Sequence, residues 1–332
     1  MATWGGNVNP TLDLVTVGEA MALLIAQETG ALSRVTDFSR ATAGAELNVA
    51  VGIKRLGLSV GYISKVGADS FGEHLLAFLD QQGIDRKHVQ IDPDHSTGFM
   101  LKSREVDGRD PTIEYFRRNS AASYLCLIDN PVDYCLASRH LHLTGISPAL
   151  STRLRELVFE MSRLARAQGR TISFDPNLRP RLWPSQAAMV ECINRLAACS
   201  DLVMPGLAEG QLLTGQSTAE GIANFYLEKG VSQVVVKLGS QGAFVASKEG
   251  FATISGFEVE TVVDTVGAGD GFAVGVISAL LEGMSLSEAA RRGNAIGARV
   301  VQFPGDCDGL PNRIELDEYV RRGSLSSGVV FV

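Results

Sequence analysis

Short runs of apolar residues alternate along this chain with longer segments in which apolar residues recur every three or four positions. The short runs lie at residues 12–18, 60–66, 140–146, 171–176, 201–206 and 233–239. The segments with helical period lie at Glu46–Leu56, Phe71–Gln82, Leu150–Ala167, Ser185–Ala198 and Thr218–Gly230. Strand, helix and strand in this order are typical of βαβ units. The pattern predicts an α/β fold with a doubly wound, mainly parallel sheet and helices on both faces.

Two segments interrupt this alternation. Residues 24–44 and 95–120 lack a helical period and place turn residues between β-forming residues. The stretch 97–118 is typical of a hairpin, because Asp107-Gly108 separates two runs of strand-forming residues. We expect these segments to form a small β-sheet that acts as a lid over the strand ends. The domain boundaries expected on this basis are a core at 12–24, 45–94 and 121–322, a lid at 25–44 and 95–120, and a flexible leader at 1–11, with the role of 323–332 left open.

Composition narrows the classes of function. The chain has 332 residues, is 45% hydrophobic and carries a formal net charge of −7, which argues against nucleic acid or an anionic membrane as the main partner. No apolar run approaches the about 20 residues that span a bilayer, and the N-terminus lacks a signal-peptide pattern. The five cysteines are scattered. These features predict a cytoplasmic protein with reduced thiols.

The stretch "DTVGAGDGF", residues 264–272, is the strongest chemical motif in the chain. Its glycines fall where the helical period that starts at Phe272 begins. The first N–H groups of a helix have no partner within it, and glycine lets the backbone curl so that such groups converge. The motif therefore predicts an anion cradle suited to phosphate.

Asp270 lies inside this cradle and has two interpretations. It could simply cap the helix. It could instead be a general base, because phosphoryl transfer needs a donor held in line, stabilised charge and a hydroxyl relieved of its proton. A Walker A loop is absent from the sequence. The glycine spacing also matches Rossmann-type loops, although those normally open the first βαβ unit of a domain.

Two signatures together resemble the ribokinase-like (PfkB) family of carbohydrate kinases. "DTVGAGDGF" is similar to that family's C-terminal signature, and "AGAELNVAVGIKRLG" at 43–57 is similar to its N-terminal glycine motif. With the expected lid and βαβ order, the resemblance covers nearly the whole chain. It implies transfer of the γ-phosphate of ATP, with Mg²⁺, to a sugar hydroxyl.

The resemblance also implies roles for individual residues. Asp270 matches the base, with Gly267, Ala268 and Gly269 as the backbone anion hole; Gly44 and Asn48 match sugar contacts; Lys237, Gly239 and Gly242 match the loop near the nucleotide; and Asn294 matches a residue near the adenine. Glu209 matches the acid that helps to place hydrated Mg²⁺, although a solvated helix glutamate would look the same. The asparagine of that family motif is replaced here by Gly206.

Arginines indicate the kind of sugar. Arg117 lies on the expected lid beside Tyr115, and Arg179 follows the run at 171–176, where ligands bind in doubly wound sheets. Guanidinium groups bind carboxylates bidentately, so two such groups closing on one substrate favour an acidic sugar. These motifs resemble the 2-keto-3-deoxygluconate kinase branch of the family, in which the matching tyrosine and arginines hold the substrate. Met100 departs from relatives that carry tyrosine in this stretch.

Several alternatives stay open at this point. The chain could be a fructokinase or ribokinase acting on a neutral sugar, or a catalytically silent sugar-binding regulator on the same fold. The stereochemistry of the sugar and activation by a monovalent cation, which the family resemblance suggests, are not settled by the sequence. We expect small-molecule partners, namely a sugar acid and ATP, and a homodimer or higher homo-oligomer formed through the lid.

Overall fold

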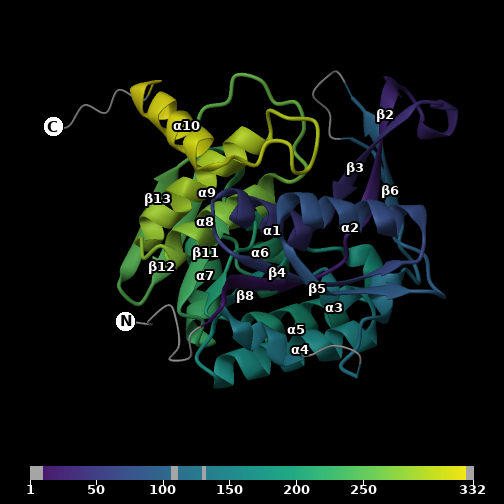
Figure 1. Cartoon of the computed structure of the whole chain (residues 1–332). Helices are drawn as coiled ribbons and strands as arrows, with labels where there is room; N and C mark the ends of the chain where they lie inside the picture. Colours follow the sequence, from purple (N-terminus) through teal and green to yellow (C-terminus); the bar gives the residue numbers. More distant parts are fainter. Residues whose placement is uncertain (1–9, 106–110, 129–131, 327–332) are drawn as a thin grey trace.

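The chain folds around a large central sheet, with a small second sheet beside it (Figure 1). The computed structural model describes residues 10–105, 111–128 and 132–326. The expected doubly wound, mainly parallel sheet is confirmed in this part of the chain, where nine strands pair side by side. In sheet order they are β13 (Gly250–Ser255), β12 (Gly242–Ser247), β11 (Gln233–Lys237), β10 (Leu202–Val203), β9 (Thr171–Asp175), β8 (Ser138–Thr144), β1 (Leu12–Val17), β4 (Val60–Gly67) and β5 (Asp85–Asp92).

Both faces of this sheet are buried, which explains why its strands read as continuous apolar runs. Leu14 packs into the core on one face, and its neighbour Val15 packs into the core on the other. Val235 and Val236 divide between the two cores in the same way. Successive side chains of a strand point to opposite faces, so a strand covered by helices on both sides needs apolar residues at every position.

The helices form one layer on each face (Figure 1). One layer contains α1 (Ala45–Arg55), α2 (Ser70–Gln82), α8 (Ala268–Leu281), α9 (Leu286–Val300) and α10 (Arg313–Ser326). The other contains α3 (Ser147–Leu150), α4 (Thr152–Ala167), α5 (Gln186–Ala197), α6 (Leu207–Thr214) and α7 (Ala219–Glu228). Short 3₁₀ helices lie at Leu32–Arg34, Ala121–Tyr124, Val132–Ala137, Pro180–Leu182 and Gly239–Gln241. Within residues 10–326, as far as they are described, no helix has the length and apolarity to cross a bilayer.

One edge of the central sheet is antiparallel. β12 pairs antiparallel with β11 and β13, whereas the pairs from β11 through β5 are parallel. The sequence pattern did not indicate β13, because this strand consists of exposed and half-buried residues and forms no apolar run. β12 was not predicted either, although it is buried. This edge forms one wall of a cavity described below.

The small sheet is built from the two segments that interrupt the βαβ alternation. Its strands are, in order, β3 (Phe38–Ala43), β2 (Met21–Thr29), β6 (Phe99–Arg104) and β7 (Ile113–Phe116). β6 and β7 pair antiparallel as the expected hairpin, and its Asp107-Gly108 turn lies outside the described residues. So do residues 1–9 of the expected leader and the end of the chain after 326. Met21, Leu23, Ala43 and Met100 form a small apolar core in this sheet.

Helices α8 and α9 approach each other more closely than side chains would allow. A Cβ atom placed on Gly275 of α8 would lie 2.5 Å from the backbone nitrogen of Gly293 on α9. Helix α8 begins inside the glycine-rich signature, and the close contact with α9 fixes the direction of α8.

We therefore predict that Gly275→Ala destabilises the protein by about 1–3 kcal/mol or more, because the added methyl group meets rigid backbone. Gly221→Ala is the matched control, since a Cβ at this helical glycine meets the side chains of Gln216 and Thr218 at 3.0–3.2 Å and no backbone atom among its nearest neighbours. Urea unfolding measures both variants. Equal stability of the two would contradict the packing argument.

Candidate active site

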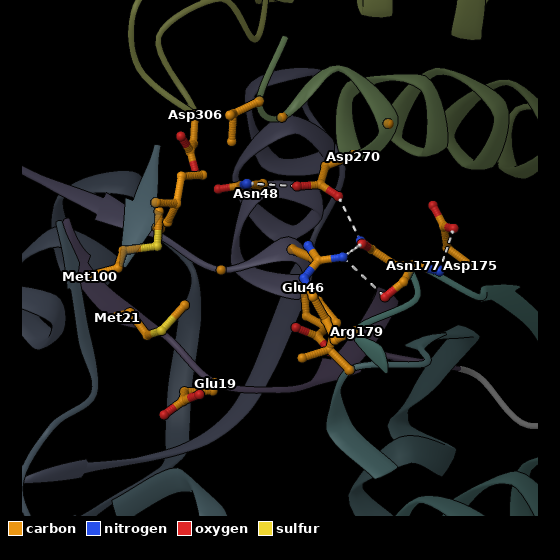
Figure 2. A pocket seen from close by; sticks show the side chains of 18 of the residues that line it. Glu19, Met21, Glu46, Asn48, Met100, Asp175, Asn177, Arg179, Asp270 and Asp306 are labelled. Carbon is orange, nitrogen blue, oxygen red and sulfur yellow. Dashed lines mark hydrogen bonds between the residues drawn. The ribbon is translucent and has the colours of Figure 1, made fainter. Parts of the chain in front are cut away.

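Two cavities meet at the N-terminus of α8, at the carboxyl ends of the central strands. The first, of about 270 Å³, lies between the core and the small sheet (Figure 2). The second, of about 800 Å³, lies between the antiparallel edge and helix α9. Gly269 and Lys237 line both. The structure brings all the site residues expected from the sequence into these two cavities: Gly44, Asn48, Tyr115, Arg117, Arg179, Glu209, Gly267 and Asp270 line the first, and Gly239, Gly242, Ala268 and Asn294 line the second.

The glycine turn at the start of α8 is held by its surroundings. Gly267 precedes the helix in the left-handed region, with φ of 82°, and a Cβ there would lie 2.6 Å from the backbone oxygen of Asp306. The carboxylate of Asp264 accepts a hydrogen bond from the N–H of Val266 at 3.0 Å. The turn therefore places the start of α8 at the boundary between the cavities, which is the position that an anion cradle requires.

The carboxylate of Asp270 faces the first cavity. Its Oδ2 accepts a hydrogen bond from Nδ2 of Asn48 at 2.7 Å, and its Oδ1 accepts one from Nδ2 of Asn177 at 3.4 Å (Figure 2). Cys307 fixes the orientation of the Asn48 amide, because its thiol donates to Oδ1 of Asn48 at 3.0 Å. Among the described residues the Asp270 carboxylate therefore contacts two side-chain amides and not the helix backbone, which favours the general-base hypothesis over simple capping.

Electrostatics give Asp270 the character of a base near neutral pH. Burial raises the pKa of its carboxyl group to about 7, and the charges of Asp175 and Asp306 add to this, against the lowering effects of Asn48 and Lys237. A base works best when its pKa lies close to the operating pH. The neutral amide of Asn48 holds the carboxylate in place without the strong lowering of pKa that a cation would cause.

Lys237 brings a positive charge to the boundary between the cavities. Its Nζ lies 2.7 Å from Oδ2 of Asp175, and a Cβ on Gly269 would be 3.6 Å from this nitrogen. Burial lowers the pKa of Lys237, but Asp175, Glu209 and Asp270 outweigh that effect and raise it. Lys237 is therefore a permanent cation beside the anion cradle.

The two arginines expected in the sugar site lie in different environments. Nε of Arg117 donates to Oε2 of Glu19 at 2.6 Å, and both side chains are buried. The charge of Arg117 is therefore already compensated. Arg179 reaches into the cavity beside Asn177, where its NH1 donates to Oδ1 of Asn177 at 2.6 Å (Figure 2). Among the described residues Arg179 contacts no carboxylate, so it is the arginine available to an anionic ligand.

Several residues that line the first cavity were not predicted from the sequence. Glu19, Glu46, Asp175 and Asn177 are all among them. Glu46 is buried and bonded to Thr144 and Ser147, and burial raises the pKa of its carboxyl group. Asp175 and Asn177 belong to the same "DPN" stretch as Arg179, and their position just after a buried strand was a signal that could have identified them.

The second cavity combines apolar walls with a polar end. Gly242 has φ of +106°, and a Cβ there would lie 2.0 Å from the backbone oxygen of Ile254. Asn294 donates from Nδ2 to the same oxygen at 3.1 Å, which leaves its Oδ1 available as an acceptor. Phe257, Val262 and Val301 supply apolar contacts. Such a lining suits a flat heterocycle with an amino group.

Glu209 lies in the first turn of helix α6 and lines the first cavity. Its Oε1 accepts from the N–H of Leu178 at 2.7 Å, and its Oε2 accepts from the N–H of Gly206 at 2.8 Å. Gly206 therefore supplies a backbone donor where the family motif carries asparagine. Each carboxylate oxygen of Glu209 keeps a lone pair that can accept a hydrogen bond from a water molecule. Glu209 could therefore hold a hydrated metal ion through water.

Comparison with known proteins identifies the class. The model of the pfkB family of carbohydrate kinases matches residues 11–313. The 2-dehydro-3-deoxygluconokinase of Bacillus subtilis (strain 168) is 51% identical over 312 residues, which cover 93% of this chain and 95% of that protein. A PfkB protein from Polaromonas sp. JS666 has a crystal structure that is 48% identical, with a TM-score of 0.86 over 92% of this chain and 99% of that one. An Escherichia coli structure in complex with ATP and Mg²⁺ is 27% identical, with a TM-score of 0.86 over 94% of this chain and 99% of its own.

The chain belongs to the pfkB family of carbohydrate kinases. The fold and the pair of cavities agree with this membership. The protein is an ATP-dependent sugar kinase, and the enzyme class expected from the two signatures is confirmed.

Asp270→Asn provides the first test of the site. We expect kcat to fall about 10²–10⁴-fold, because a base is lost while the shape of the side chain is kept. In the wild type, kcat/KM should rise with pH through an apparent pKa of about 7, since the carboxylate form is the active one.

Stability should move in the opposite direction. The folded-state pKa of Asp270 is raised above its unfolded value, so the native state loses stability as pH rises through about 7. The stability of Asp270→Asn relative to wild type should therefore increase from about pH 4 to about pH 7 and level off above it. Urea unfolding across this pH range measures the effect. A constant difference would contradict the raised pKa of Asp270.

Proposed function

We propose that the substrate is 2-keto-3-deoxygluconate, also called 2-dehydro-3-deoxygluconate, and that its terminal C6 hydroxyl is phosphorylated. The observation that carries this is the placement of Asp270 and Arg179 in one cavity, where the Asn177 amide lies between a base of raised pKa and a guanidinium that contacts no carboxylate among the described residues. The Bacillus subtilis relative that carries this substrate in its name supports the acidic sugar over fructose or ribose.

Arg179 binds the carboxylate end of the sugar acid in this proposal. Its guanidinium offers N–H donors that are not engaged with acids, and charge-assisted bonds of this kind are among the strongest in water-excluded sites. Tyr115 lines the same cavity from β7 and packs or hydrogen-bonds beside the carboxylate. Arg117 remains paired with Glu19. It lines the cavity and can still donate hydrogen bonds to the sugar, but its charge is compensated. Gly44 and Asn48 contact the sugar at the start of α1, and Met21 and Met100 cover its apolar edge.

The transfer step follows from the position of the cradle. The Asp270 carboxylate takes the proton of the C6 hydroxyl while the C6 oxygen of the sugar bonds to the γ-phosphorus. The bond between that phosphorus and the bridging oxygen breaks, and ADP leaves. The N–H groups of Gly267, Ala268 and Gly269 and the ammonium of Lys237 stabilise the charge that develops on the phosphoryl oxygens. Backbone donors that are already aimed at this point need no reorganisation during the step.

ATP occupies the second cavity in this proposal, with the adenine beside Asn294 and the phosphates over Gly239, Gly242 and Lys237. Mg²⁺ neutralises phosphate charge when bound, and Glu209 with Asp175 would hold it through water. The Escherichia coli structure, which contains ATP and Mg²⁺, supports the proposal that this chain binds both.

We also propose that the small sheet is a lid and that the protein is a cytoplasmic homodimer or higher homo-oligomer joined through the lid. The core predicted at 12–24, 45–94 and 121–322 changes at one boundary, because β2 starts at Met21 and residues 21–24 therefore belong to the lid. Phe116 on β7 is 46% exposed and stacks on Phe99, which gives the lid an exposed apolar side chain suited to self-association. The cysteines form no disulfide among the described residues, consistent with a reducing compartment. Light scattering of the purified protein tests the dimer.

A coupled assay of ADP release tests the substrate. We expect turnover with 2-keto-3-deoxygluconate and at most weak turnover with fructose or ribose, and the galactonate epimer tests stereochemistry. Efficient phosphorylation of a neutral sugar would replace the proposal with the fructokinase or ribokinase alternative. Binding of sugar acid without ATP turnover would instead identify a silent sugar-binding regulator.

Arg179→Ala tests the carboxylate contact. We expect KM for the sugar acid to rise about tenfold or more, which corresponds to the about 1.5–3 kcal/mol of a hydrogen bond to a charged group. KM for ATP should stay within about twofold of its wild-type value. Arg181→Ala is the control, because Arg181 is exposed and lies in the 3₁₀ helix that directly follows Arg179. Equal rises in both KM values would indicate a structural role for Arg179.

A further inference from the structure

Lys102 is a buried cation whose charge the transfer chemistry does not use. It lies on β6 of the small sheet, and its side chain is only 3% exposed. Its ammonium group leaves the small sheet and enters a pocket of oxygen atoms on the core. The ammonium pairs with the carboxylate of Asp264, lies 3.3 Å from Oδ1 of Asp306 and donates to the backbone oxygen of Pro304 at 3.2 Å.

Both acidic partners of Lys102 hold the glycine turn of α8. Asp264 accepts the N–H of Val266, the residue just before Gly267. The backbone oxygen of Asp306 lies against the α-carbon of Gly267 so closely that a side chain there has no room. The ammonium group of Lys102, which belongs to the lid, therefore joins the segments of Asp264 and Asp306 that hold the turn.

Charge makes this contact more than a surface ion pair. Asp264 is 7% exposed and Asp306 is 4% exposed, so without Lys102 two carboxylates would lie buried next to each other. Removing one partner of a buried ion pair is strongly destabilising, because the charge that is left has neither water nor a counter-ion. The two carboxylates would repel, and the segments that they belong to would separate.

We propose that Lys102 is a positioning residue that couples closure of the lid to the geometry of the anion cradle. Its ammonium is a cation tethered to the lid. When the lid closes, Lys102 docks between Asp264 and Asp306 and draws the turn into the arrangement that receives the phosphoryl group. When the lid opens, the oxygen cage loses its cation and the turn loosens. The inference rests on the proposed kinase and lid roles.

A consequence concerns free cations. Carboxylate and carbonyl oxygens are the ligands that hard cations take, and here the chain supplies the charge itself. The wild-type enzyme should therefore be indifferent to potassium or ammonium in the buffer. A variant with a vacated cage should depend on them.

The experiment compares Lys102→Ala, which leaves space for an ion, with Lys102→Met, which fills that space without charge. We expect kcat of both to fall at least tenfold, less than the about 10²–10³-fold loss of an oxyanion-hole donor itself. Ammonium or methylammonium chloride should restore Lys102→Ala at least fivefold and leave Lys102→Met unchanged. Tetramethylammonium chloride controls for ionic strength. Lys87→Met, which removes an exposed lysine from a surface pair with Asp85, should match the wild type.

Hydrogen exchange of the backbone amides in 264–270, followed without substrate, gives a readout that does not depend on the assay. Exchange should accelerate in Lys102→Ala and slow again when ammonium is added. If Lys102→Ala does not fold, Lys102→Ala/Asp306→Asn removes one charge of each sign and should fold with the same loose turn. Activity of Lys102→Ala within twofold of wild type, or a loss that no small cation reverses in a folded variant, overturns the inference. A wild type inactive on every sugar would instead refute the proposed function, and the exchange experiment would still decide the role of Lys102.

Discussion

The hydrogen bond from Asn48 to Asp270 joins two helix starts that are 222 residues apart, and the arrangement of the site depends on it. One partner belongs to the first turn of α1 and the other to the first turn of α8. The bond satisfies a buried carboxylate with a neutral donor. A cation in the same place would satisfy it better and would lower its pKa, and the carboxylate would then be a weaker base. Geometry is therefore held by a group that leaves the proton affinity high.

The boundary between the cavities has the opposite electrostatics. One cation and two carboxylates lie there together with backbone N–H groups: Lys237, Asp175 and Glu209. Both anionic and cationic groups of a ligand can therefore find a group of opposite charge. A phosphoryl group that crosses from one cavity to the other passes this boundary. Because the donors belong to the ends of β11 and the start of α8, they are fixed by packing on both faces of the sheet. Rigid elements can hold such donors more accurately than loops can.

Much of this arrangement could be predicted from the sequence. Buried parallel strands gave apolar runs, and the glycine-rich motif predicted the start of a helix with an acid in its first turn. The pattern could not show the antiparallel edge, because β13 is half exposed and has no apolar run. It also could not show which charges meet. Glu19 and Arg117 are 98 residues apart, and nothing in either local sequence reveals that they pair. Lys102, a lysine on a strand, gives the same pattern whether it faces water or two buried aspartates.

The pair of Glu19 and Arg117 bears on how a pocket of this kind changes its ligand over evolutionary time. The guanidinium is already built into the wall, and its attraction for anions is masked by the nearby Glu46 and above all by one paired acidic neighbour, Glu19. Loss of that neighbour's charge would unmask a second basic group without any new side chain having to arise. Selectivity between acidic and neutral sugars can thus drift through the masking residue, while the arginine that eventually contacts the ligand stays where it is.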